Sequence, residues 1–151
     1  MNDDTAAQED NNINNRQQKR YTKKDRGYTT GHIQKLLDVS DDRVKLMVLL
    51  FASTGMRLAG LTGLKIRNLS EIQINGIMIY QITVYEGSKE EYITFCTPEC
   101  ARAIDSYFAY RERSGEKLDP NSPLVREQFD STDLICVKNP KFIISSTVEK
   151  W

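Results

Sequence analysis

The chain has 151 residues, of which 39% are hydrophobic and 28% charged, and Lys plus Arg equals Asp plus Glu at 21 each. This length suits one domain with a tail, and a net charge of zero excludes a uniformly basic protein, so any nucleic-acid surface must be a local patch. No apolar run reaches the roughly 18 residues that span a bilayer, and the N-terminus lacks a signal-type apolar segment. We therefore expect a soluble, cytoplasmic protein without a membrane partner.

The three cysteines, Cys96, Cys100 and Cys136, are an odd number, which favours a reducing compartment and no disulfide framework. Cys96 and Cys100 could begin a metal site, but the single histidine, His32, is far away in sequence. We predict buried free thiols, no metal, and a structural or surface role for His32.

Residues 1–26 consist mostly of Asn, Gln, Asp and Lys and offer almost nothing to bury, so we expect this segment to be disordered when alone. Acidic residues come first and a basic run follows. The basic run is either a solvated tail or expression remnant, or a strap that lies along a phosphate backbone and binds DNA. Its members are Arg16, Lys19, Arg20, Lys23, Lys24 and Arg26.

From residue 27 onward the pattern is that of a folded domain that begins with helices. The spacing predicts a short helix after Thr29 or Thr30, and a central core helix that Ser40 or Asp41 caps and Gly55 ends. A third, short helix is predicted over residues 57–64.

The spacing of the apolar residues then changes from that of helices to the alternation that is typical of strands. Apolar and polar residues alternate over residues 71–95, and Asn75-Gly76 and residues 86–88 are turn chemistry, which predicts a three-stranded antiparallel meander. A helix capped by Thr97, with Pro98 in its first turn, runs to Gly115. A loop-rich segment follows, and "STVEKW" predicts the start of another helix. The expected fold is α+β, mainly helical with one small antiparallel sheet.

One motif places a permanent cation in the least polar stretch of the chain, "LLFASTGMRLAGLTGL", where Arg57 stands between Met56 and Leu58. Together with the following segment, "ASTGMRLAGLTGLKIRNL" resembles the Thr-Gly-x-Arg box of the tyrosine recombinase (phage integrase) catalytic domain. "VYEGSKEEYITF" resembles the β-hairpin of that family, which carries a catalytic lysine. The Thr-Pro-led helix is the third match, and the wording of "TPEC" and "GEKLDPNSPL" looks most like archaeal members. The resemblance covers about residues 28–151.

The resemblance implies that Arg57 is the first arginine of a phosphodiester-cleaving site, delivered by a turn that Thr54 and Gly55 shape. A planar guanidinium can bridge two phosphate oxygens, and apolar neighbours would hold it in a partly dry site where charge develops. The alternative is a buried arginine bonded to backbone carbonyls at a helix junction. Lys89 would donate a proton to the leaving oxygen and reach a groove of the DNA; the alternative is a solvated hairpin charge beside Glu90 and Glu91.

Two features depart from the family pattern. The position three residues after the arginine, where the family has an acidic residue, is Gly60 here. The His-x-x-Arg box and the tyrosine nucleophile of the family follow a helix like "STVEKW" and have no counterpart in this chain. Tyr107 and Tyr110 lie on a different helix, so no residue is assigned as nucleophile.

We therefore expect residues 27–151 to be the N-terminal part of an integrase-like catalytic domain, which binds duplex DNA, and other recombinase subunits, without a metal or small-molecule cofactor and is inactive alone. One alternative is a short integrase-like module that binds DNA or regulates a recombinase. The other is an unrelated α+β interaction domain in which Arg57 is structural.

Overall fold

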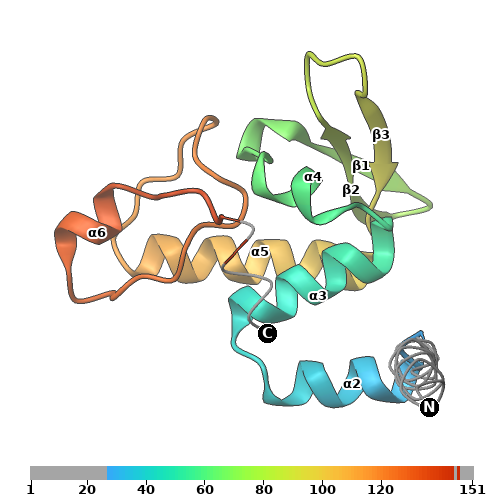
Figure 1. Cartoon of the computed structure of the whole chain (residues 1–151), viewed down its shortest axis with the longest axis horizontal. Helices are drawn as coiled ribbons and strands as arrows, with labels where there is room; N and C mark the ends of the chain where they lie inside the picture. Colours follow the sequence, from blue (N-terminus) through green and yellow to red (C-terminus); the bar gives the residue numbers. More distant parts are fainter. Residues whose placement is uncertain (1–26, 145, 147–151) are drawn as a thin grey trace, which may run out of the picture. The chain divides into compact units, whose positions relative to one another are not determined.

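The computed structural model describes residues 27–144 and 146. The chain divides into two compact units, Met1–Ile33 and Gln34–Trp151. The basic run of residues 16–26 and residues 147–151 of the last predicted helix lie outside the described residues. Among those that are described, the elements are α2 (Thr30–Val39), α3 (Asp42–Thr54), α4 (Leu58–Thr62), the 3-10 helix η1 (Ile66–Asn68), β1 (Leu69–Ile74), β2 (Ile77–Val84), β3 (Tyr92–Phe95), α5 (Pro98–Arg113) and α6 (Leu134–Lys138) (Figure 1).

The helix ends follow the capping chemistry of the sequence. The Asp41 carboxylate accepts the Val44 N–H at 2.8 Å and begins α3. Gly55 ends α3 in the left-handed conformation, with a φ of 64°, which glycine adopts without strain. The Thr97 hydroxyl accepts the Cys100 N–H at 3.3 Å, and Pro98 occupies the first turn of α5. The predicted central and Thr-Pro-led helices are thereby confirmed.

The sheet is the predicted antiparallel meander in the order β1-β2-β3. Asn75 and Gly76 both have positive φ, of 51° and 78°, and connect β1 to β2 in a two-residue turn. One face of β2, formed by Tyr80, Ile82 and Val84, is buried against the helices.

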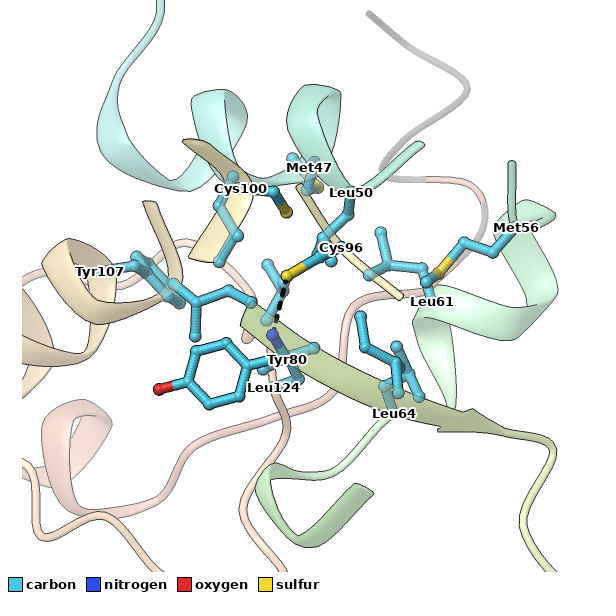
Figure 2. Packing of buried hydrophobic residues seen from close by; sticks show 14 of the residues in the cluster. Met47, Leu50, Met56, Leu61, Leu64, Tyr80, Cys96, Cys100, Tyr107 and Leu124 are labelled. Carbon is cyan, nitrogen blue, oxygen red and sulfur yellow. Dashed lines mark hydrogen bonds between the residues drawn. The ribbon is translucent and has the colours of Figure 1, made fainter. Parts of the chain in front are cut away.

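The core lies between that sheet face and the helices (Figure 2). α3 and α5 pack side by side, and α5 runs from the sheet toward the loop region that carries α6 (Figure 1). Cys96 and Cys100 are buried free thiols, as predicted, and the Cys96 sulfur accepts the Tyr80 N–H at 3.3 Å. A hydrogen bond from Cys100 lowers the pKa of Cys96 to about 7, although burial opposes this shift. Cys136 is an exposed free thiol.

The other face of the sheet is also apolar, because the alternation changes phase within β2 between Ile79 and Ile82. The register pairs β1 with β2 and β2 with β3 so that the outward side chains form one patch. We call this patch the outer sheet face. Its apolar members are Ile72, Ile74, Ile77, Ile79, Ile93 and Phe95, and four of them, Ile74, Ile77, Ile93 and Phe95, are about half exposed.

Two further features complete the description. α6 was not predicted, although Asp133 caps it with hydrogen bonds from the Ile135 and Cys136 N–H groups at 2.9 and 3.2 Å. In the described part of the chain, no helix has the length and apolar character that crossing a membrane requires.

Candidate nucleic-acid interface

Arg57 is delivered by a tight turn between α3 and α4. The Thr54 hydroxyl donates to the Leu50 carbonyl at 2.6 Å and accepts the Met56 N–H at 3.3 Å, while the Gly55 N–H donates to the Phe51 carbonyl at 3.0 Å. Arg57 then takes the extended N-cap position of α4. Thr54 and Gly55 therefore shape this turn, as the resemblance implied.

The environment of Arg57 differs from both sequence-based interpretations. Its side chain is exposed, and it makes no hydrogen bond or ion pair with any residue that the structure describes. The predicted partly dry setting is therefore wrong, and so is a buried arginine bonded to carbonyls. Met56, the preceding residue, turns into the core instead, which lets the apolar stretch accommodate a surface cation. All five guanidinium donors are available to a ligand.

Gly60 fixes the position of α4 against the sheet. A Cβ at this position would lie 2.9 Å from Cγ1 of Val84, closer than side chains approach one another, so the two segments can meet only because residue 60 has none. The Gly60 N–H donates to the Arg57 carbonyl at 2.9 Å, which places the glycine one helical turn after the arginine. An acidic side chain at residue 60 is therefore excluded by packing.

Lys89 lies in the turn that connects β2 to β3. This turn is held by its own hydrogen bonds: the Gly87 N–H donates to the Glu91 carboxylate at 2.6 Å, and the Ser88 N–H donates to the Tyr85 carbonyl at 3.0 Å. Lys89 is exposed and has no side-chain partner among residues 27–144. Glu90 and Glu91 are both exposed beside the lysine, and the Glu91 carboxylate accepts the Gly87 N–H.

A cavity of about 220 Å³ lies between α4 with η1 and the hairpin. It contains two cations that the sequence analysis did not identify, Lys65 and Arg67. Arg67 is paired with Glu86 at 2.9 Å, and the Asn68 amide donates to the same carboxylate at 3.0 Å. The hydrogen bond from Asn68, and then that from Arg67, hold the pKa of Glu86 below its ordinary value. The lining residues are Gly60, Gly63, Leu64, Lys65, Arg67, Asn68, Tyr85, Glu86 and Ser88.

Arg111 and Arg126 are buried, and neither lines this cavity. Arg111 is fully buried on α5, where its Nε donates to Glu116 at 3.0 Å and its Nη1 donates to the carbonyls of Pro123 and Leu124 at 2.9 and 3.1 Å. Glu116 also accepts from Arg126 at 2.6 Å. This triad joins α5 to the loop that follows it and has a structural role.

Neither tyrosine of α5 near its C-terminal end, Tyr107 or Tyr110, is an exposed side chain. Tyr107 is buried, which raises the pKa of its phenol, and its hydroxyl accepts the Arg126 N–H at 3.4 Å. Tyr110 is half-buried and stacks on Tyr107 with ring centroids 6.5 Å apart. His32 is exposed, and its Nδ1 accepts the Thr29 N–H at 3.4 Å, which agrees with a surface role.

The described residues thus define an α+β domain in which a helix turn and a hairpin bring two exposed cations to neighbouring segments. No protein-family model and no curated protein sequence matches the chain. Among solved structures, the crystal structure of XerA recombinase is similar, with a TM-score of 0.55 and 21% sequence identity over 82% of this chain and 39% of that one. The chain therefore spans about two fifths of the length of that recombinase, and the likeness shows that it has a recombinase-like fold.

Proposed function

We propose that this chain is a DNA-binding, N-terminal part of a tyrosine recombinase catalytic domain, in which Arg57 and Lys89 contact the phosphate backbone near the cleaved bond. The observation that carries the proposal is the packing of α4 against β2 through Gly60 and Val84. This contact joins α4, which follows Arg57, to the end of β2, which leads into the hairpin that bears Lys89, and the cavity lies between these two segments. Both cations are exposed and unmatched by a carboxylate in the described part of the chain.

The charges around this cavity support a phosphate ligand. Lys65 and Arg67 supply two positive charges, and Glu86 supplies one negative charge. Arg57 and Lys89 on the adjoining segments add two more cations, and Glu90 and Glu91 offset part of this excess, which leaves one net positive charge. DNA would thus be attracted by a local patch in a chain whose total charge is zero.

The roles of the two residues follow from their chemistry. Arg57 would bind two non-bridging oxygens of one phosphate, and Lys89, on a long flexible stem, would reach a groove or the leaving oxygen. Other recombinase subunits would supply or complete the groups that this chain does not offer. No metal or small-molecule cofactor is assigned a role in the proposal.

Titration of a short duplex at several salt concentrations tests the binding. We expect weak binding with little sequence preference, and a plot of log affinity against log salt whose slope becomes shallower by about 2 in an Arg57→Ala/Lys89→Ala variant, since each lost phosphate contact removes about 0.9. Arg113→Ala/Lys117→Ala is the matched control, because it removes two exposed cations at the end of α5 and after it, away from α4 and the hairpin. Equal losses in both variants would contradict the proposed site.

A denaturing gel with an end-labelled, nicked suicide duplex tests the chemistry. Stabilising charge in a pocket does not start cleavage without an oriented nucleophile. We expect no covalent adduct with this chain alone, with or without magnesium. A shifted band that disappears in Tyr107→Phe or Tyr110→Phe would show that the nucleophile is misassigned. A band that requires a full-length recombinase would support a site shared between subunits.

A further inference from the structure

Tyr85 adopts a backbone conformation that a tyrosine rarely takes. It directly follows the strand β2 and has a φ of 56°, in the left-handed region, although the hairpin contains a glycine, Gly87, two residues later. A bulky residue in this region costs about 1 kcal/mol or more relative to glycine, which would adopt it freely. The turn alone therefore gives no reason for a tyrosine at this position.

The ring of Tyr85 lies against α4 at the glycine already described. Its hydroxyl oxygen is 3.7 Å from the point that a Cβ on Gly60 would occupy. Glycine inside a helix is itself unfavourable, by about 1 kcal/mol relative to alanine. Two locally unfavourable choices, a tyrosine in the hairpin and a glycine in the helix, thus place one phenol at the α4–hairpin contact.

The hydroxyl of Tyr85 is available to a ligand. It makes no hydrogen bond with any residue in the described range, and the side chain is only half-buried. The ring also contacts the ring of Tyr92, at a centroid distance of 6.1 Å in an edge-on arrangement. Tyr85 lines the cavity that also contains Lys65 and Ser88.

We propose that Tyr85 is a phosphate-contacting residue, whose hydroxyl donates a hydrogen bond to a DNA backbone phosphate seated in this cavity beside Lys65. The proposal rests on the proposed function and deepens it. Lys65 supplies the charge, because its ammonium makes no ion pair within 4.0 Å of a described carboxylate, while Arg67 is held by Glu86. Tyr85 and Ser88 supply neutral donors that fix the direction of the phosphate, and Gly63, which has nothing within 4 Å of its Cβ position, leaves room for it.

The test compares Tyr85→Phe with Tyr92→Phe in the full chain. Both remove one phenolic hydroxyl from neighbouring rings, but only Tyr85 lines the cavity. We expect Tyr85→Phe to weaken binding of a short DNA duplex about tenfold, the typical effect of losing a hydrogen bond to a charged group. Tyr92→Phe should bind within about twofold of the original chain.

Two further measurements separate this role from a structural one. The salt slope of Tyr85→Phe should equal that of the original chain, because no charge is lost, whereas Lys65→Ala should lower the slope by about 1. The urea midpoint of Tyr85→Phe should be unchanged, because the hydroxyl bonds no described residue.

The outcomes distinguish a failure of the Tyr85 proposal from a failure of the proposed DNA-binding function. If the original chain binds DNA and Tyr85→Phe binds equally well, the role of Tyr85 is overturned while the proposed function stands. If the original chain does not bind DNA at all, both are overturned.

Discussion

Two arginines that have apolar neighbours in the sequence differ completely in their burial. Arg57 interrupts the least polar stretch of the chain and lies on the surface, whereas Arg111 occupies an apolar position of α5 and is fully buried. The supply of acceptors accounts for the difference. Arg111 meets the Glu116 carboxylate and two carbonyls of the 123–124 segment, while the turn after Gly55 directs Arg57 to water.

Alanine substitutions should therefore separate the two residues. We expect Arg57→Ala to change the free energy of unfolding by no more than about 0.5 kcal/mol. Arg111→Ala should cost about 3–5 kcal/mol, because it leaves Glu116 buried with one partner fewer and orphans two carbonyls. Urea unfolding of both variants measures this. A loss above about 1.5 kcal/mol for Arg57→Ala would return that residue to a structural role.

The same triad makes stability depend on acid. Burial alone would raise the pKa of Glu116, but the hydrogen bonds from Arg111 and Arg126 outweigh it and hold this pKa below its ordinary value of 4.5. The unfolded chain then binds more protons between the two values, so the stabilising contribution is complete above pH 4.5 and is lost as the pH falls through the folded pKa. Unfolding measured from pH 7 to pH 3 should show this decline. Glu116→Gln should be less stable at pH 7 and should show a smaller decline; an unaltered decline would assign it to other carboxylates.

The helices and strands that could be predicted are those whose ends are specified by capping or turn residues nearby in the sequence. Asp41, Gly55, Thr97 and the Asn75-Gly76 turn each specify a cap or a bend from neighbouring residues, and the elements they bound are confirmed. α6 was missed because five residues carry little periodicity. Arg57 and Lys89 were singled out from local motifs, but Tyr85 and Lys65 were not. Their common cavity arises from a tertiary contact between α4 and β2, which no local pattern encodes.

That contact predicts opposite effects for two glycine substitutions in one short segment. Gly60→Ala should destabilise the chain by about 1–3 kcal/mol, because its Cβ would press on Val84 at 2.9 Å and outweigh the gain in helix propensity. Gly63→Ala should be neutral or slightly stabilising, since nothing lies within 4 Å of its Cβ position and its φ of −96° suits alanine. Urea midpoints of the two variants decide the matter, and equal values would disprove the close approach of α4 and β2.

For the whole molecule, a net charge of zero conceals an uneven distribution along the chain. Residues 1–15 contain four acidic and no basic residues, and residues 16–26 contain six basic residues and one acidic residue. The similarity to XerA recombinase covers 82% of this chain and 39% of that one. In our proposal, DNA binding by this chain depends on the cavity and on the basic run.

Two truncations distinguish the loss of the basic run from the mere shortening of the chain. Deleting residues 1–15 removes only acidic charge and should leave the DNA affinity unchanged or raise it. Deleting residues 1–26 should lower both the affinity and the salt slope, because it also removes the basic run. Titrations at several salt concentrations give both quantities. A full-length chain and a 1–26 deletion with the same slope would show that the basic run does not contact phosphates.

The outer sheet face has a consequence for how the protein behaves at high concentration. Copies with no net charge do not repel one another at long range, and here they also expose a patch of half-exposed isoleucines beside the free edge of β3. Colloidal stability should therefore be lowest near the isoelectric point, about pH 6.6. We expect light scattering at this pH to rise with protein concentration. Ile93→Lys, which puts one positive charge on the edge strand, should suppress this scattering more than Glu112→Lys, which puts a positive charge at an exposed position of α5.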